Sequence, residues 1–139
     1  MTKTSGRPCA IETAARYHIW LWSLQNPKRL GKTVLQKLNN PENEFWLSPI
    51  STWEALTLNA KGRIRLPEDL GSWVAKATAK LQEAPLTHEI VLAAGRLRLS
   101  RNDPADRFLA ATAQLLRLTL VTADATLLGL GDISTLSNR

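Results

Sequence analysis

The 139-residue sequence is poor in the side chains that build disulfides and transition-metal sites. Its single cysteine, Cys9, excludes an intrachain disulfide framework and a cysteine-based zinc cluster. Cys9 is better interpreted as a small apolar residue than as a reactive thiol. The only two histidines, His18 and His88, argue against a histidine-rich metal site. A metal bound to this chain would therefore need carboxylate ligands, which favours magnesium or manganese.

Long apolar runs and glycine-rich phosphate loops are also missing. No apolar stretch approaches the roughly 18 residues that cross a bilayer, and the N-terminus lacks the apolar centre of a secretory signal. We therefore expect a cytoplasmic protein with no membrane partner. No glycine-rich loop follows an expected strand, which argues against a nucleotide-binding regulator. The serines form no elbow motif, so a nucleophilic triad is not expected either.

Positive charge exceeds negative charge along the chain. The sequence has 18 Lys and Arg against 12 Asp and Glu, a formal net charge of +6. This excess favours a polyanionic partner such as RNA, DNA or an acidic protein, although solvation alone also explains many basic surfaces. The candidates for RNA contacts are Arg63, Arg65, Arg96 and Arg101.

The length and the 44% hydrophobic content predict one globular domain. We expect a disordered lead-in over residues 1–8 and a single domain over 9–139. Strands are expected at 44–48 and 118–122, with extended pieces at 84–86 and 132–136. Helices are expected from Pro27, at 49–59 with Ser51 as its N-cap, at 68–82, at 87–97 and from Pro104. Strands that alternate with helices predict an α/β fold with a parallel sheet, whose ligands gather at the carboxyl ends of the strands.

Acidic residues follow the expected strands. Glu54 lies in the first turns of the helix after strand 44–48, Asp103 and Asp106 open the helix at Pro104, and Asp124 comes two residues after strand 118–122. Taken singly, these acids also fit a capping box, an N-cap, a helix-dipole partner and an Asx-turn. Together at one sheet edge they would repel one another unless a cation intervened. A divalent metal held there can activate water for in-line attack on phosphorus, which is typical of a nuclease.

Four segments in sequence order carry a family resemblance: residues 48–54 (SPISTWE), 61–67 (KGRIRLP), 103–107 (DPADR) with Ala110, and 120–124 (LVTAD). From about Tyr17 to the C-terminus the chain resembles a PIN-domain ribonuclease, most closely the VapC toxins of prokaryotic toxin–antitoxin pairs. The resemblance implies a three-layer α/β/α fold with a central parallel sheet. It also implies a magnesium- or manganese-dependent endoribonuclease, a hydrolase that cleaves RNA with a metal-activated water. A cognate antitoxin that occludes the site is implied as a partner, and a homodimer is common.

The family's functional residues can be matched to positions in this sequence. The resemblance assigns Glu54, Asp106 and Asp124 as catalytic metal ligands and Asp103 as an accompanying acid, either a ligand or a cap. Thr122 would be a polar residue beside the metal. Arg107 would orient a carboxylate or contact phosphate, and a salt bridge is an equally open interpretation.

The start of the chain departs from the family pattern. Members begin with an apolar strand that ends in Asp-Thr-His, whereas Arg16 and Tyr17 precede His18 here. A cation at a metal-ligand position repels the ion, and residues 12–15 lack the apolar character of a central strand. Three interpretations stay open. In the first, Glu12 and Thr13 replace the missing Asp-Thr pair. In the second, the segment before His18 has been altered and the enzyme is impaired. In the third, the protein is a natural non-catalytic module that binds an antitoxin or RNA.

Overall fold

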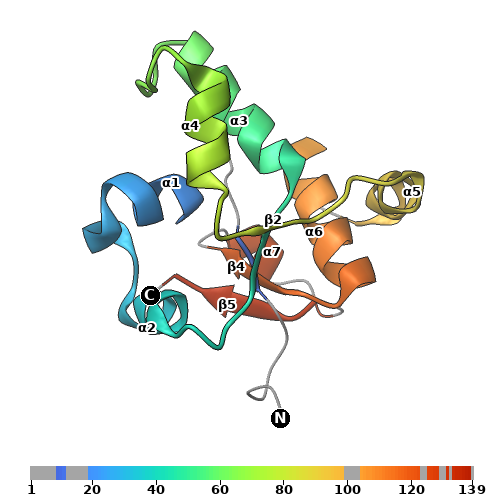
Figure 1. The fold of residues 1–139 in the computed structure, drawn as a ribbon. Coiled ribbons are helices and arrows are strands. Elements are labelled where there is room, and N and C mark those ends of the chain that lie inside the picture. The colour runs from blue at the N-terminus through green and yellow to red at the C-terminus, as the bar shows by residue number, and fades with distance from the viewer. Residues whose placement is uncertain are drawn as a thin grey trace.

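The computed structural model describes residues 9–11, 19–98, 104–122, 125–128, 131 and 133–138. Within them, five short strands form one all-parallel sheet in the order β3-β2-β1-β4-β5 (Figure 1). The expected lead-in over residues 1–8 lies outside the described residues. The strands are β1 (Cys9–Ile11), β2 (Phe45–Leu47), β3 (Gln82–Glu83), β4 (Thr119–Thr122) and β5 (Thr135–Ser137).

Helices connect the strands, as a parallel sheet requires. They are α1 (Ile19–Gln25), α2 (Lys32–Asn39), α3 (Pro49–Ala60), α4 (Leu70–Ala77), α5 (His88–Arg96), α6 (Pro104–Leu116) and α7 (Ala125–Leu128), with a 3-10 turn, η1, at Pro27–Arg29. The α/β fold class predicted from the sequence is confirmed. None of the described helices is long and apolar enough to cross a bilayer.

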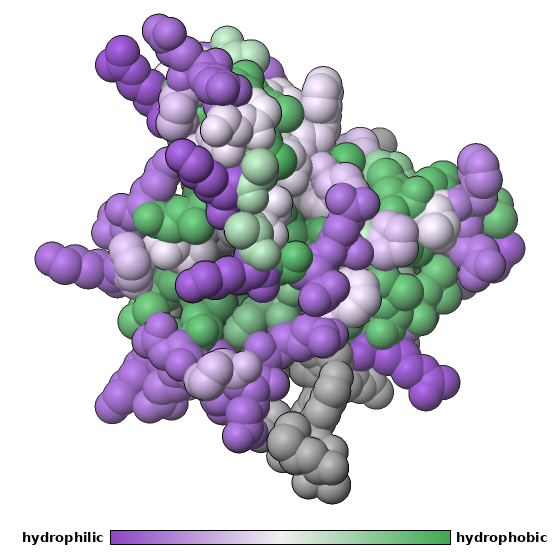
Figure 2. Space-filling model, in the orientation of Figure 1, coloured by the Kyte–Doolittle hydropathy of each residue, from purple (hydrophilic) through white to green (hydrophobic). Residues whose placement is uncertain are grey.

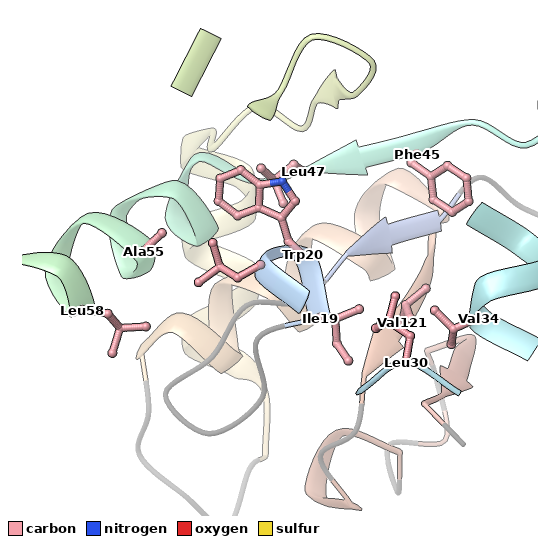
Figure 3. Close-up of a cluster of buried hydrophobic side chains, with 10 residues drawn as sticks. Ile19, Trp20, Leu30, Val34, Phe45, Leu47, Ala55, Leu58 and Val121 are labelled. Atoms are coloured by element: carbon pink, nitrogen blue, oxygen red, sulfur yellow. The ribbon is translucent and has the colours of Figure 1, made fainter. Parts of the chain in front are cut away.

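Alternating side chains place one apolar cluster on each face of the sheet. Phe45 and Leu47 of β2 and Val121 of β4 join residues of α1, α2 and α3 in the cluster shown in Figure 3. Leu120 of β4 joins residues of α6 and α7 in a second cluster, against which Trp46 of β2 packs. Because neighbouring residues of β2 and β4 serve opposite clusters, the sheet is the middle of three layers.

The central strand, β1, comes from a segment that the sequence did not predict as a strand. Cys9 and Ala10 pair with β2, and Cys9, Ala10 and Ile11 pair with β4. The strand begins at Cys9, where the domain was expected to start. Residues 12–15, which lack the character of a central strand, come after β1 in the sequence and lie outside the described residues.

Two expected elements between β2 and α5 are wrong in extent. The helix expected over 68–82 is α4, which ends at Ala77, and the extended piece expected at 84–86 is β3 at Gln82–Glu83. Thr78 ends α4, and its hydroxyl donates to the Val74 carbonyl. The Ala84 N–H then donates to the Leu47 carbonyl at 2.9 Å. Pairing with β2 therefore draws this segment into the sheet, a tertiary contact that overrides its local helical preference.

The basic helix expected from Pro27 is divided. Residues 27–29 form η1, Leu30 and Gly31 have extended backbones, and α2 begins at Lys32. Leu30 is buried in the first cluster. The extended backbone turns this side chain inward and leaves the flanking basic residues exposed.

The sequence predicted Ser51 as the N-cap of α3, and this prediction is wrong because the N-cap is Ser48. The Ser48 Oγ accepts a hydrogen bond from the Ile50 N–H at 3.2 Å, and Pro49 occupies the first helical position. Proline is favoured there because its missing N–H would have had no partner in the helix. Ser51 is instead fully buried on the inner face of α3. Thr87 caps α5, and its hydroxyl oxygen accepts a hydrogen bond from the Ile90 N–H at 3.3 Å.

Replacing Ser48 by alanine is expected to lower the free energy of unfolding by about 1 kcal/mol, because the cap hydrogen bond is lost. Urea denaturation measures the change. Ser72→Ala is the control, since Ser72 is exposed on α4 and its backbone N–H, not its hydroxyl, bonds to Asp69. Equal losses in the two variants would contradict the assignment of Ser48 as the cap.

Candidate metal and nucleic-acid site

The sheet order defines where a ligand crevice belongs. From β1 the chain continues to β2 on one side, and β4 lies on the other side. In parallel α/β sheets, ligands bind outside the carboxyl ends of the strands at such a switch point. The carboxyl ends of β1 and β4 are Ile11 and Thr122. Glu12 follows Ile11 in the sequence, and Asp124 comes two residues after Thr122. Both acids lie outside the described residues.

Thr122 is fully buried at the end of β4. Its carbonyl accepts a hydrogen bond from the backbone N–H of Asn138 at 3.0 Å. This bond extends the pairing of β4 with β5 and fixes the backbone at the carboxyl edge of the sheet. The polar side chain that the resemblance assigns to the metal's surroundings therefore belongs to a strand that is paired up to its last residue.

Glu54 lies in the second turn of α3 and is half-buried. The cap at Ser48 starts α3 directly after β2. The first turns of the helix therefore begin at the carboxyl end of β2 and extend outward from the sheet (Figure 1). Ile50, one turn before Glu54, packs against the cluster that contains Leu109 and Ala110 of α6. Residues four apart share one face of a helix, so Glu54 lies on the face of α3 that turns toward α6.

Asp106 lies in the first turn of α6, and only 3% of its surface is exposed. The position suits a carboxylate, because the positive end of a helix dipole stabilises negative charge. Its Oδ1 atom is buried without a hydrogen bond from any described residue, although the residue does interact elsewhere. Asp106 precedes Ala110 by one turn and shares its face of the helix. A buried carboxylate at this depth is costly unless a cation or hydrogen bonds compensate for it.

Because α3 and α6 are in contact, Glu54 and Asp106 lie on neighbouring helices (Figure 1). The other matched acids, Asp103, Asp124 and Glu12, lie outside the described residues, and within those residues no three His, Cys, Asp or Glu form a group. The donors that are described are two carboxylates and the Thr122 hydroxyl. Such oxygen donors fit magnesium or manganese and would not select zinc or copper.

Arg107 has a structural role that the sequence did not predict. Its Nη1 donates to the carbonyls of Ala94 at 3.2 Å and Leu97 at 2.8 Å. These acceptors lie at the end of α5, where carbonyls have no partner within the helix and a cation is favourable. Arg107 thus joins α5 to α6 just after Asp106. Its role beside the metal stays a prediction.

The remaining candidates divide by exposure. Four of them, Arg63, Arg65, Arg96 and His88, are exposed. Arg101 and His18 lie outside the described residues. Ser51, which the sequence suggested only as a cap, has a buried hydroxyl with no hydrogen-bond partner among the described residues. Its position three residues before Glu54 was the available signal for a place near the site.

A groove of about 500 Å³ opens beside this region, between α3 and the segment of α4 and β3. Its lining is largely apolar and includes Trp53, Leu56 and Val74. Trp53 is 62% exposed, an unusual state for a large aromatic side chain in a core-facing helix.

Comparison with known proteins agrees with this geometry. The family model for the PIN domain matches residues 18–131. The fold is similar to that of VapBC2 from Rickettsia felis, solved bound to a DNA fragment from its promoter, with a TM-score of 0.67 and 16% identity over 94% of this chain and 98% of that one. It is also similar to FitAB bound to the IR36 DNA fragment, with a TM-score of 0.62 and 12% identity over 94% of each chain. No curated protein matches in sequence.

The chain belongs to the PIN domain family. Its fold is similar to those of the chains matched in VapBC2 and FitAB, and the resemblance to a PIN domain found in the sequence is confirmed. The family match begins at His18, so Glu12 and Arg16 both precede it. The segment that departs from the family's Asp-Thr-His pattern therefore lies just before the matched residues.

Proposed function

We propose that the protein is a divalent-metal-dependent endoribonuclease and the toxin of a toxin–antitoxin pair. The observation that carries the proposal is the pair of carboxylates, Glu54 and Asp106, on two contacting helices of a PIN domain. A net charge of +6 on the same chain suits a polyanionic substrate.

Each residue has a part in the proposed reaction. Glu54 and Asp106 hold the ion together with Asp124, and Asp103 supports them. Thr122 adds a polar group at the end of β4. When bound, magnesium or manganese supplies an activated water and stabilises charge on the phosphate during in-line attack. Lysine and arginine side chains hold the RNA backbone, because phosphate contacts position a strand without reading its sequence.

The place of β1 supports Glu12 as the further acid. The strand ends at Ile11, so Glu12 is the first residue after the carboxyl end of the central strand, whereas Arg16 comes four residues later. In the family the missing acid lies at the end of the corresponding strand. We therefore prefer the interpretation in which Glu12 and Thr13 replace the missing pair and the extra residues precede His18.

The proposed partners are the RNA substrate, a cognate antitoxin and a second copy of the chain. The similar structures VapBC2 and FitAB are named as two-component assemblies and were solved with DNA fragments. An antitoxin that covers the carboxyl edge of the sheet would block RNA. We place the protein in the cytoplasm, where RNA is available to it.

Cleavage of a structured RNA pool tests the proposal, with magnesium or manganese present and a chelator as control. The proteins compared are the parent chain, Glu12→Gln and Arg16→Asp. We expect the parent to cut only with metal, Glu12→Gln to cut much more slowly, and Arg16→Asp to behave like the parent.

The alternative is an impaired PIN module that binds an antitoxin or RNA, and Arg16 at the family's acidic position favours it. Cleavage by Arg16→Asp alone would show a disabled nuclease with an intact fold. Silence from all three proteins under every metal condition would contradict the enzyme and leave the binding module.

A further inference from the structure

Three exposed cations lie together on the segment that joins η1 to α2. Lys28 and Arg29 belong to η1 and Lys32 opens α2, and we call this set the basic arm. Residues 13–41 contain no acidic residue, so no neighbour in the sequence neutralises the arm. Figure 2 shows hydrophilic side chains gathered over α2 and the adjoining C-terminal end of the chain.

Asn138 fixes the basic arm to the carboxyl edge of the sheet. Its Oδ1 accepts a hydrogen bond from the Gly31 N–H at 2.6 Å, and its Nδ2 donates to the Arg29 carbonyl at 3.2 Å. The backbone N–H of the same residue donates to the Thr122 carbonyl. One residue therefore bonds on one side to the strand end beside the candidate metal site and on the other side to the arm.

Arg29 is also held by an aromatic ring. Its guanidinium carbon lies 4.3 Å from the centroid of the Trp22 ring, the geometry of a cation–π pair. Stacking occupies the face of the guanidinium and leaves its N–H edges available. Those edges bind phosphate through two parallel hydrogen bonds, and less side-chain entropy is lost when the group is already placed.

We propose that Lys28, Arg29 and Lys32 bind the backbone of the single-stranded RNA that flanks the cleaved phosphate. The proposal rests on the proposed nuclease function, because Thr122 relates the arm to that site. Three cations on one acid-free segment, one of them oriented for bidentate contact, fit successive phosphates. Asn138 is a positioning residue that keeps the arm at the edge where the strand must pass.

Binding measured without metal separates this surface from catalysis. The probe is a fluorescent single-stranded RNA of about 12 nucleotides, a length near the upper range of such sites, in excess chelator across a series of salt concentrations. The test variant is Lys28→Gln/Arg29→Gln/Lys32→Gln. The matched control is Lys61→Gln/Lys76→Gln/Lys80→Gln, which also removes three exposed cations. Lys61 follows α3, Lys76 lies in α4 and Lys80 follows α4.

The test variant should bind RNA at least about 10-fold more weakly at low salt, and its log–log salt slope should fall by about 2, since each single-strand phosphate contact contributes about 0.7. The control should keep the parent slope. Asn138→Ala should lie between the parent and the test variant, with a raised KM and an unchanged kcat in cleavage. An equal loss of RNA affinity in the test and control variants would show that only the net charge of the protein matters, and would overturn the proposal.

The outcomes separate this proposal from the nuclease itself. Cleavage by the parent with an unchanged KM in the test variant would overturn the basic arm and leave the nuclease standing. Binding that depends on the arm, without cleavage, would support the arm and contradict the nuclease. A polyglutamate peptide bound by the arm more tightly than RNA would overturn the choice of RNA and indicate an acidic protein partner.

Discussion

Replacing Asp106 by asparagine is expected to lower the rate of RNA cleavage by about 100-fold or more. Changes to groups that only support a metal ligand typically cost 10- to 100-fold, so loss of a ligand should reach or exceed that range. At 25 °C a 100-fold loss corresponds to about 2.7 kcal/mol of transition-state stabilisation. The side chain keeps its shape and loses only its charge, which isolates the electrostatic contribution.

The same substitution should leave the protein folded. Asp106 is almost completely buried, and the neutral amide lowers the desolvation cost of a buried charge while it gives up the favourable interaction of that charge with the helix dipole. Urea denaturation and metal titration accompany the cleavage assay. Glu89→Gln is the matched control, because Glu89 also lies in the first turn of a helix, α5, but is exposed. Parent-like cleavage by Asp106→Asn would remove this residue from the site.

Trp20→Ala is expected to lower the free energy of unfolding by about 3–5 kcal/mol, the range for removing a buried aromatic side chain. Trp20 is 1% exposed in the centre of the first cluster (Figure 3). Its ring lies 5.5 Å from that of Trp73, and its Nε1 donates to the Ala77 carbonyl at 3.4 Å. The residue thus joins α1 to α4 across the sheet face.

A loss of this size is a large part of the roughly 5–15 kcal/mol that holds a domain folded. Urea denaturation measures it, with Trp53→Ala as the control. Trp53 is the same residue type but is 62% exposed, so its removal should change stability by no more than about 0.5 kcal/mol. A Trp20→Ala protein as stable as Trp53→Ala would contradict the contribution of Trp20 to this cluster.

Local signals predicted the elements that carry the described site residues. Pro49 and Pro104 each mark the start of a helix, and α3 and α6 begin there. Aromatic residues in β2 and β-branched residues in β4 were sufficient to indicate these two strands. The sequence therefore placed Glu54 on the helix after β2 and Asp106 in the first turn of the helix at Pro104, as the structure has them.

Tertiary contacts decided what the sequence did not predict. β1 has three residues with no alternation of polar and apolar side chains, and its pairing with β2 and β4 alone makes it a strand. The family resemblance assigned Arg107 to the surroundings of the site, with a salt bridge equally open, and its side chain donates to carbonyls at the end of α5. Asn138 bonds to Gly31 across 107 positions, a separation that no local pattern reveals.

The pairing of β1 with β4 has a consequence for the order in which the molecule is made. Synthesis delivers β1 and β2 early, but the other neighbour of the central strand comes much later in the chain. Sheets that depend on such distant partners fold slowly and leave apolar surface uncovered in the meantime. Thr122 and Asn138 both follow β1 by more than 100 residues. The nuclease proposed for this chain would therefore be unable to cleave RNA through most of its own translation. Its active site could form only after β4 and β5 have been synthesised.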